Sequence, residues 1–367
     1  MIADFALGKP TDVTGQATEF VRGLITSGVL AEGQKLPSTA ALGAQWGVPV
    51  ASVHVALSEL VRDGLLVRQA GKGTFVCRDK APLTAVAIYT LADALANPES
   101  NVQRVILAEL QRQLNDQGIQ AHVVVDPRSD DAQKDPLEPL RKLAREHRVG
   151  ATIAASTNHR LLGWLGRLPH VAAFVGDKRI AGQVVNDFDQ MADLCLGALA
   201  EQGCRSVGLI CALRPDAPPY GSGYHPQMEF HNHFVEVACD LGLRISDRWM
   251  RLSPPSVHSG IFAQTGYELF RALWAEPEHP DGLVVYPDSF MPGVLLAMAE
   301  LGVRPPADLR LAYHRNEQTP LLNPYPATEA ILSEREVAAA LIAQARRLWK
   351  GEQCEPVMVE FKRNDKV

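Results

Sequence analysis

Residues 36–76 read LPSTAALGAQWGVPVASVHVALSELVRDGLLVRQAGKGTFV, and this stretch decides the architecture of the N-terminal part of the chain. A first helix is predicted to follow Ser38, whose side chain suits an N-cap, and to run to about Trp46. Pro49 suits the first turn of a second helix, because its missing N–H costs no hydrogen bond there. The apolar stripe of that second helix recurs at helical spacing and consists of Val53, Leu57, Leu60 and Val61. The stretch therefore predicts two consecutive helices joined by a tight turn at Gly47.

The segments on either side complete a small domain. One helix is predicted before it, with an apolar face made of Ala17, Phe20, Val21, Leu24 and Ile25. After it, two short β segments, Leu65–Arg68 and Thr74–Cys77, flank a turn over residues 69–73. Three helices followed by a glycine-tipped hairpin predict a winged helix-turn-helix domain over residues 10–80, with a linker at residues 81–84.

The rest of the chain alternates short apolar β-type runs with helical segments. The β-type runs are Val86–Tyr89, Val123–Val125, Thr152–Ala155, Val171–Val175, Val207–Cys211 and Leu283–Tyr286. Helical candidates include Val102–Gln117, Asp189–Gln202 and Gly293–Leu301. Regular alternation of this kind predicts an α/β fold around a mostly parallel sheet.

The length of this region favours two lobes over one sheet. We assign residues 85–367 to a two-lobed domain, with lobe 1 at about residues 85–187 and 308–326 and lobe 2 at about residues 188–307 and 327–367. Open α/β sheets bind ligands beyond the carboxyl ends of their strands, so the cleft between the lobes is the expected ligand site.

Composition excludes several classes of protein. With 46% hydrophobic and 21% charged residues, the 367-residue chain can bury large cores, which excludes intrinsic disorder for most of it. No apolar run reaches the roughly 18 residues of a membrane span, and Met1–Pro10 lacks the apolar core of a secretory signal. The six cysteines show no C-x-x-C spacing, which favours reduced thiols in a cytoplasmic protein over a disulfide or zinc framework. No G-x-S-x-G elbow, P-loop or H-E-x-x-H motif occurs, so we expect neither an enzyme nor a bound cofactor or metal.

Charge is divided unevenly along the chain. The formal net charge is −6, which by itself argues against a nucleic-acid partner. Residues 17–80, however, contain seven basic and five acidic residues and so carry +2, while residues 81–367 carry −7. The small N-terminal domain is therefore mildly basic, and the acidity belongs to the α/β region.

The N-terminal segment resembles the DNA-binding domain of the GntR family of bacterial regulators. The matching residues are Ile25, Ser27-Gly28, Gly33, Leu36-Pro37-Ser38, Leu42, Gly47-Val48, Val53, Ala56-Leu57, Leu60, Gly64-Leu65-Leu66 and Gly71-Lys72-Gly73-Thr74-Phe75-Val76. The resemblance implies that the helix from about Pro49 enters the major groove while the tip at residues 71–73 approaches the minor groove and the backbone. The implied DNA contacts are Ser38, Thr39, Ser52, His54, Lys72 and Gly73.

The sequence departs from this family at three positions that usually carry arginine and here carry Ala40, Val50 and His54. Arginine is the commonest reader of guanine, so their loss is expected to weaken base discrimination. Three alternatives stay open. His54 is a DNA contact or an exposed helix residue without a role, Ser38 is a cap or also a contact, and Arg62 pairs with a nearby carboxylate or touches DNA.

A second resemblance is carried by Asn186-Asp187, Gly203-Cys204-Arg205-Ser206-Val207-Gly208-Leu209-Ile210, Pro280 to Asp288, Gly293, Leu301-Gly302-Val303 and Pro306-Ala307-Asp308-Leu309. In these pieces the α/β region is similar to the effector domain of LacI/GalR repressors and to type I periplasmic binding proteins. A GntR-type DNA-binding domain joined to a LacI/GalR-type domain occurs in the arabinose-repressor-like subfamily. The ligand contacts implied by the resemblance are Tyr89, Asp177, Phe230, Asp288, His314 and Arg315. Phe230 stands where the family has a sugar-binding arginine, and Arg315 where it has an aspartate, which suggests a ligand of different polarity from a neutral monosaccharide.

The resemblances together imply a ligand-responsive transcriptional regulator, in the first instance a repressor. Its expected partners are double-stranded operator DNA, a small-molecule effector such as a sugar or sugar derivative, and a second copy of the chain in a homodimer. The alternative hypothesis is a small-molecule sensor or interaction module whose DNA-binding domain has lost specific base readout. No membrane partner is expected.

Overall fold

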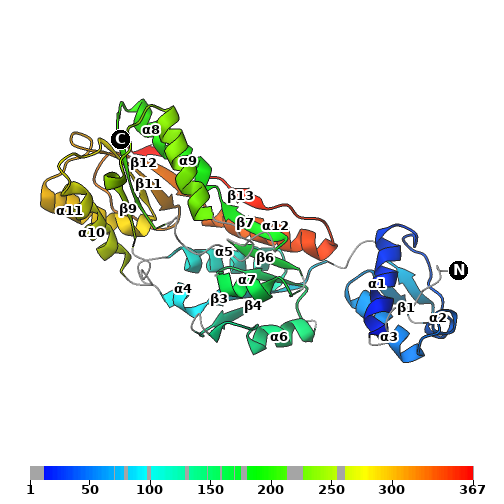
Figure 1. Cartoon of the computed structure of the whole chain (residues 1–367). Coiled ribbons are helices and arrows are strands. Elements are labelled where there is room, and N and C mark those ends of the chain that lie inside the picture. Colours follow the sequence, from blue (N-terminus) through cyan, green and yellow to red (C-terminus); the bar gives the residue numbers. More distant parts are fainter. Residues whose placement is uncertain are drawn as a thin grey trace. The chain divides into compact units, whose positions relative to one another are not determined.

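The computed structural model describes residues 12–69, 71–77, 82–96, 101–128, 132–146, 148–157, 159–168, 170–174, 180–212, 226–253 and 261–366. The chain divides into two compact units between Thr84 and Ala85 (Figure 1). This is the position at which the sequence predicted the second domain to begin. Each unit is described by itself.

The N-terminal unit has the order of elements predicted for a winged helix-turn-helix. Its elements are α1 (Val13–Thr26), α2 (Thr39–Trp46), α3 (Val50–Arg62), β1 (Leu66–Gln69) and β2 (Gly73–Val76). The two strands are antiparallel, and each begins one residue away from its predicted position. The shift arises because Leu65 still donates its backbone N–H to Leu60 at the end of α3, and because the ladder closes on the pair of Gln69 and Gly73.

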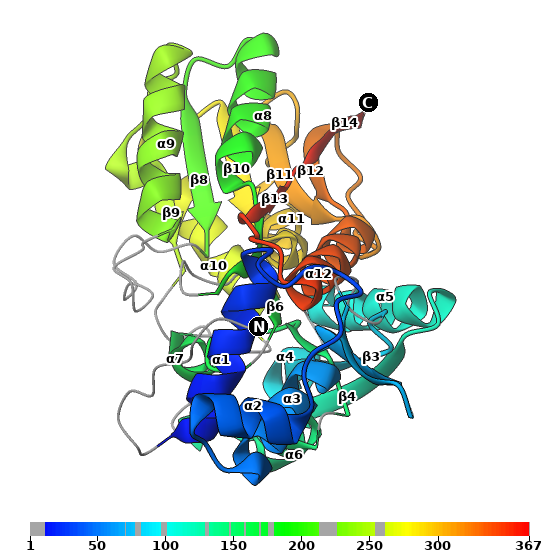
Figure 2. The ribbon, with the colours of Figure 1, turned by 90° about the vertical axis from the view of Figure 1, so that its right-hand side faces the viewer.

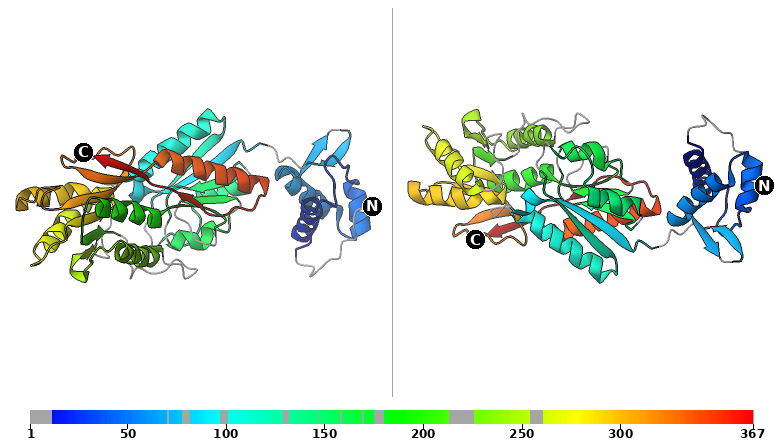
Figure 3. Two further views of the ribbon diagram at one scale, coloured as in Figure 1. Left: turned by 90° about the horizontal axis from the view of Figure 1, so that it is seen from above. Right: turned by 90° about the horizontal axis from the view of Figure 1, so that it is seen from below.

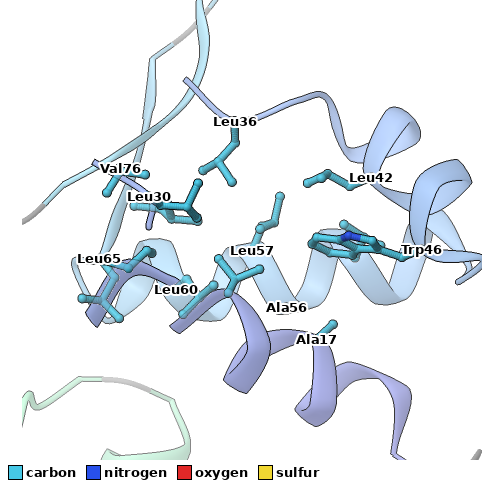
Figure 4. Close-up of a cluster of buried hydrophobic side chains, with 14 of the residues drawn as sticks. Ala17, Leu30, Leu36, Leu42, Trp46, Ala56, Leu57, Leu60, Leu65 and Val76 are labelled. Atoms are coloured by element: carbon cyan, nitrogen blue, oxygen red, sulfur yellow. The ribbon is translucent and has the colours of Figure 1, made fainter. Parts of the chain in front are cut away.

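Buried apolar side chains from all of these elements form one core (Figure 4). The predicted stripe of α3 faces it, with Val53, Leu57 and Leu60 buried. The ring of Trp46 meets Phe20 of α1 edge to face, with 5.9 Å between the ring centroids. The core therefore fixes α3 between α1 and the β-hairpin and leaves its opposite side to solvent.

Two carboxylates near the end of α3 connect it to α1. Thr18 Oγ1 donates to Glu59 Oε2 at 2.8 Å, and Arg22 Nη2 donates to Asp63 Oδ2 at 2.5 Å. Glu59 and Asp63 are the carboxylates nearest to Arg62 in the sequence, and α1 engages both of them. They hold the helices of the unit together.

The C-terminal unit contains two six-stranded sheets, one in each lobe. The sheet of lobe 1 is parallel throughout, in the order β13-β7-β6-β5-β3-β4. Its strands are β3 (Ala85–Leu91), β4 (Gln120–Asp126), β5 (Ala151–Ala154), β6 (Val171–Phe174), β7 (Gly182–Asn186) and β13 (Val357–Val359). The sheet of lobe 2 has the order β14-β12-β11-β10-β8-β9 and is parallel except for β14. Its strands are β8 (Val207–Cys211), β9 (Met250–Leu252), β10 (Gly282–Tyr286), β11 (Arg310–Asn316), β12 (Ala327–Leu332) and β14 (Lys362–Lys366).

Helices pack against both sheets. Those of lobe 1 are α4 (Ala92–Ala96), α5 (Val102–Asp116), α6 (Glu138–Arg145), α7 (His159–Leu165) and α12 (Glu334–Lys350). Those of lobe 2 are α8 (Phe188–Glu201), α9 (Pro226–Asp240), α10 (Phe262–Trp274) and α11 (Met291–Leu301). Helices α8 and α9 lie side by side next to β8 (Figure 2), and α5 and α12 lie side by side in lobe 1 (Figure 3).

The predicted division into lobes is wrong in its C-terminal half. Residues 308–326 were expected in lobe 1, but their strand β11 pairs with β10 and β12 in lobe 2. Residues 327–367 were expected in lobe 2, but α12 and β13 belong to lobe 1. The chain crosses between the lobes at three places, between β7 and α8, between β12 and α12, and between β13 and β14. Each crossing has only one or two residues between elements, so no loop marks it in the sequence.

Among the described residues, no single helix has both the length and the apolar character needed to cross a membrane. The bent pair Thr39–Trp46 and Val50–Val61 passes the same test together, by length and composition alone.

Candidate functional site

The side of α3 that faces away from the core is the first candidate surface. His54 is exposed there, next to Val50 and Val55, which are 50% and 47% exposed. Ser52 is half-buried on the same helix. The described part of this surface therefore presents the imidazole of His54 beside two exposed apolar side chains.

Ser38 and Thr39 lie at the start of α2. The Ser38 hydroxyl accepts a hydrogen bond from the backbone N–H of Ala41 at 3.2 Å, so the predicted N-cap is confirmed. Ser38 remains exposed and Thr39 is half-buried. Capping satisfies one of the unpaired N–H groups of the first turn, and the exposed hydroxyl still has lone-pair and donor capacity for a second partner.

The tip of the β-hairpin presents backbone and cations together. Gly71 and Gly73 adopt φ values of 71° and 122°, which only glycine tolerates easily. A Cβ on Gly73 would lie 2.8 Å from Lys35 Cε, so the stem of Lys35 lies directly over this glycine. Lys72 is exposed between the two glycines. The tip thus carries two ammonium groups beside accessible backbone.

Arg68 of β1 is a functional candidate that sequence reasoning did not single out. Its Nη2 donates to Ser58 Oγ at 2.9 Å and lies 3.4 Å from the backbone oxygen of His54, while its Nη1 lies 3.5 Å from His54 Nε2. Strand alternation is the signal that would have found it. Arg68 lies two residues after buried Leu66, so both side chains point toward the same side of the hairpin, where α3 lies.

A second site lies at the carboxyl ends of β10 and β11 in lobe 2. The carboxylate of Asp288, just beyond β10, accepts from the backbone N–H of Asn316 at 2.9 Å and from its side-chain amide at 3.0 and 3.1 Å. The backbone N–H of Asp288 donates to His314 Nδ1 at 3.2 Å. All three side chains are buried. The structure therefore brings predicted residues Asp288 and His314 together and adds Asn316.

Three polar atoms around this site are buried without a hydrogen-bond partner in the described structure, His314 Nε2, Asn316 Oδ1 and Glu334 Oε1. Burial lowers the pKa of His314, and its Nδ1 accepts a hydrogen bond, so the neutral ring carries its proton on Nε2. Burial raises the pKa of Glu334, whose other oxygen accepts from the backbone N–H of Gln318 at 3.2 Å. The site therefore offers at least one unpaired donor and one unpaired acceptor. This is unusual, because buried polar groups normally have hydrogen-bond partners.

Aromatic rings connect this site to the crossings between the lobes. The ring of His314 lies 5.0 Å from Tyr286 and 5.7 Å from Phe361, which lies between β13 and β14. Phe188, at the start of α8, contacts Tyr286 at 5.3 Å and Phe230 at 6.2 Å between ring centroids. Phe230 is fully buried in this cluster, as a core residue of lobe 2.

The structure separates Arg315 from Asp288. Side chains alternate along β11, so His314 and Asn316 face Asp288 while Arg315 points the other way. There Arg315 Nε donates to Glu329 Oε2 at 3.0 Å, and both residues line a hollow of about 420 Å³. Arg315 is therefore paired with a carboxylate away from the Asp288 site.

Tyr89 belongs to a closed network in lobe 1. Its hydroxyl, fully buried, donates to Asp126 Oδ2 at 2.5 Å, and Arg128 donates to both oxygens of Asp126 at 2.7 and 2.9 Å. Burial opposes ionisation of Asp126, but the hydrogen bonds from Arg128 and Tyr89 outweigh it and lower its pKa. Burial and the bond to Asp126 raise the pKa of Tyr89. Asp177, also predicted as a ligand contact, lies outside the described residues.

Within the described part of the chain, no group of three or more His, Cys, Asp or Glu side chains has the arrangement of a metal site.

Two family models match the chain. The model described as "Bacterial regulatory proteins, gntR family" matches residues 14–76, and the model for a "Periplasmic binding protein-like domain" matches residues 196–361. The first match covers α1 to β2, and the second covers most of lobe 2 together with α12 and β13.

Curated relatives match over a short part of their length. A pyridoxine biosynthesis transcriptional regulator of Corynebacterium glutamicum is 36% identical over 92 residues, which are 24% of this chain and 20% of that protein. A histidine utilization repressor of Pseudomonas aeruginosa is 32% identical over 87 residues, 24% of this chain and 35% of that protein. The repressor NagR of Bacillus subtilis is 38% identical over 72 residues, 20% of this chain and 30% of that protein. The chain thus spans about a fifth to a third of the length of these relatives.

Solved structures resemble the chain over most of its length. A LacI family transcription regulator from Clostridium acetobutylicum superposes with a TM-score of 0.58 at 20% identity, covering 77% of this chain and 98% of that chain. The trehalose repressor from Escherichia coli superposes with a TM-score of 0.53 at 17% identity, covering 77% and 99%. At this identity the likeness establishes the two-lobed α/β fold.

Proposed function

Because the chain joins a gntR-family winged helix-turn-helix domain to a periplasmic-binding-protein-like domain, we propose that it is a ligand-responsive transcriptional repressor. It binds duplex DNA through the N-terminal unit and a small-molecule effector through the C-terminal unit. The observation that carries the proposal is the joining of these two matched domains in one chain. The proposal that it represses transcription is supported by relatives that are themselves named repressors. As proposed, it works in the cytoplasm as a homodimer and catalyses no reaction.

The DNA-binding surface consists of the start of α2, the exposed side of α3 and the hairpin tip. In this proposal α3 lies in the major groove, where a helix fits, and the hairpin follows the adjacent backbone. The exposed cations Lys72 and Lys35 are available to phosphate at the tip. The base-facing and backbone contacts proposed are Ser38, Thr39, Ser52, His54, Lys72 and Gly73.

The effector site lies around Asp288 and His314. Its unpaired Nε2–H of His314 and unpaired Oδ1 of Asn316 fit a hydroxyl, which both donates and accepts. Arg315 is paired with Glu329 away from Asp288, so its charge does not indicate the ligand polarity that its position in the sequence suggested. We therefore favour a neutral polyhydroxylated effector, a sugar or a related metabolite. Phe230 supports the site from a buried position through the ring of Phe188, and neither Phe230 nor Tyr89 has exposed surface to offer a ligand.

Coupling between the sites is a population shift. An effector changes DNA binding only if it binds one arrangement of the lobes more tightly than the other. The rings of Phe361 and Phe188 lie at two of the three crossings and contact the aromatic cluster that includes His314. A ligand at His314 can therefore favour one geometry of the crossings over another.

The proposal is tested by measuring binding of the purified full-length protein to DNA from upstream of its own gene, at stated salt, against random duplex of equal length. We expect clearly tighter binding to the upstream DNA. A thermal-shift screen against sugars, sugar alcohols and sugar acids then identifies the effector, because a ligand of the native state raises its apparent stability. Equal affinity for both DNAs would contradict the regulatory function.

A second candidate function is favoured by the apolar surface of α3. Val50, at a position where the family usually has an arginine, is 50% exposed, and its neighbour on the same helix, Val55, is 47% exposed. This apolar surface suits a sensor or interaction module without specific base readout. In vitro selection from a random duplex library separates the two functions. A recovered consensus supports the repressor, and recovery of unrelated sequences at equal affinity supports the alternative.

A further inference from the structure

Arg68 carries a positive charge that the described structure does not neutralise. Its side-chain contacts are with Ser58 Oγ, with the backbone oxygen of His54 and with the His54 ring, and none of these groups is a carboxylate. No ion pair to Arg68 occurs within the described residues. Arg22, by contrast, is paired with both Glu19 and Asp63. Arg22 and Arg68 therefore differ in their partners. Arg22 forms ion pairs that hold α1 and α3 together, whereas the charge of Arg68 is not paired with a carboxylate of the described residues.

The guanidinium of Arg68 is also held in place. Ser58 Oγ, which receives its hydrogen bond at 2.9 Å, itself donates to the His54 backbone oxygen at 2.6 Å. Nη1 and Nη2 make these contacts, while the Nε–H has no partner among the residues that the structure describes. A guanidinium has five N–H donors, so donors remain for another acceptor. The side chain is exposed. Fixing it in advance lowers the entropy that a ligand must overcome.

The position of Arg68 indicates which acceptor it meets. It lies on β1, which leads into the hairpin tip, and it reaches back to α3. If α3 occupies the major groove and the hairpin tip approaches the minor groove, the sugar-phosphate backbone that separates the two grooves passes between α3 and the hairpin tip. A guanidinium between helix and hairpin therefore faces phosphate oxygens, and arginine pairs with phosphate through parallel hydrogen bonds.

We propose that Arg68 binds a DNA backbone phosphate between the two grooves, and that Ser58 and the His54 backbone position it. Strand β1 thereby supplies a guanidinium to the DNA-binding surface, where α3 lacks the arginines expected at positions 50 and 54. A phosphate contact adds affinity for every sequence and sets the register of α3, without reading bases. This inference rests on the proposed DNA-binding function and names a further residue of that site.

The experiment compares full-length wild type with Arg68→Gln, Arg68→Lys and Ser58→Ala, using the best duplex from in vitro selection with wild type and a random duplex of equal length. Affinity is measured across a series of salt concentrations. Lys142→Gln, an exposed cation on α6 of the other unit, is the matched control for loss of one charge. Thermal unfolding of each variant reports folding separately.

We expect Arg68→Gln to weaken binding to both duplexes by about tenfold and to lower the slope of log affinity against log salt by about 0.9, the value for one phosphate. Arg68→Lys should keep the slope but lose part of the affinity, because an ammonium lacks the planar fork. Ser58→Ala should keep the slope and weaken binding by a few-fold, since the charge stays but is no longer held. Lys142→Gln should match wild type.

Two results would overturn the assignment. Arg68→Gln with unchanged slope and affinity, at wild-type stability, would show that Arg68 meets no phosphate. A loss confined to the selected duplex and traced to one base pair would make Arg68 a base reader instead. If wild type itself selects no duplex and binds random DNA without a salt dependence, the proposed function fails, and that outcome is distinguishable because it involves no Arg68 variant.

Discussion

At the scale of single residues, Ser38 combines an observed role in folding with a proposed role in DNA binding. Its hydroxyl caps α2 through the N–H of Ala41, yet the residue is exposed at the start of that helix. The sequence predicted the cap correctly, because the cap depends on neighbours in the chain. It left the DNA contact open, because that contact depends on a partner outside the chain.

Substitutions at Ser38 separate these two roles. Ser38→Ala is expected to lower the free energy of unfolding of the N-terminal unit by about 1 kcal/mol, the usual loss for a missing cap. Ser38→Asp keeps a capping oxygen and so keeps stability, but its negative charge should weaken DNA binding markedly at low salt. Urea unfolding and DNA titration check the pair. Asp12→Ala, which removes the cap of α1, is the control that loses stability but keeps DNA affinity once folded. Unchanged DNA affinity in Ser38→Asp would leave Ser38 as a cap alone.

Glu334 is a buried carboxyl whose ionisation opposes folding. In the unfolded chain it ionises near its ordinary pKa of 4.5, but burial raises its pKa in the folded protein. Stability contributed by the neutral carboxyl is therefore present below pH 4.5 and lost as pH rises through the folded pKa. Glu334→Gln removes that loss, so we expect the variant to gain on wild type by about 1 kcal/mol as pH rises.

Urea unfolding at pH 5, 6.5 and 8 measures this gain, and the three pH values are more than about one unit apart, which is enough to resolve the titration of one group. Glu336→Gln, on the same helix but exposed and paired with Lys362, should follow wild type at every pH. A Glu334→Gln variant that is less stable than wild type by the same amount throughout would mean that the bond to Gln318, and not the charge, dominates.

At the scale of elements, the contact between α10 and α11 depends on a glycine. A Cβ on Gly293 would lie 1.7 Å from the backbone oxygen of Ala263 and 2.7 Å from the backbone N of Tyr267. Backbone cannot move aside as a flexible side chain can, so Gly293→Ala must push the helices apart. We expect a loss of about 1–3 kcal/mol or more in the free energy of unfolding of the C-terminal unit.

Gly197 in α8 provides the matched control for that loss. It also lies in a helix of lobe 2, but a Cβ there would meet nothing within 4 Å. Gly197→Ala should therefore be neutral or stabilise by up to about 1 kcal/mol, because alanine favours helix more than glycine does. Thermal unfolding of the two variants tests the contrast, and equal effects would mean that helix propensity, not the close contact, decides.

The elements themselves were largely predictable where local pattern is strong. Strand β8 was predicted at its observed bounds, and α5, α8 and α11 within two residues of theirs, because apolar period and length distinguish them. Strands β11 and β12 were not predicted as strands. Their sequences contain the polar residue His314 and the charged residues Arg315 and Glu329, and the two charges are accommodated by pairing across the sheet. Such pairing is tertiary and leaves no local pattern.

At the scale of the whole molecule, the missed features are those that depend on chain crossings. The sequence predicted two domains and two lobes, but it placed β11 and α12 in the wrong lobes because the crossings are so short. The same limit applies to the proposed effector site. Asp288 and His314 were singled out one by one from the sequence. Asn316 joins them because β11 pairs with β10, and Glu334 joins them because the chain continues from β12 into α12.

The charge of the whole molecule leads to the last prediction. A net +2 on residues 17–80, with three expected arginines absent, should give one N-terminal unit only modest affinity for DNA. In the proposed homodimer two such units would be held together, and linked binding raises affinity by about 10²–10⁴ without any new contact. Full-length protein should therefore bind a duplex with two correctly spaced copies of the selected half-site far more tightly than a duplex with one copy. Titration against duplexes in which the spacing is increased by about 5 base pairs, half a helical turn, should abolish the gain, because the second unit then faces the wrong side of the DNA. Equal affinity for one-copy and two-copy duplexes would show that a single unit carries recognition alone, and that the missing arginines are compensated within it.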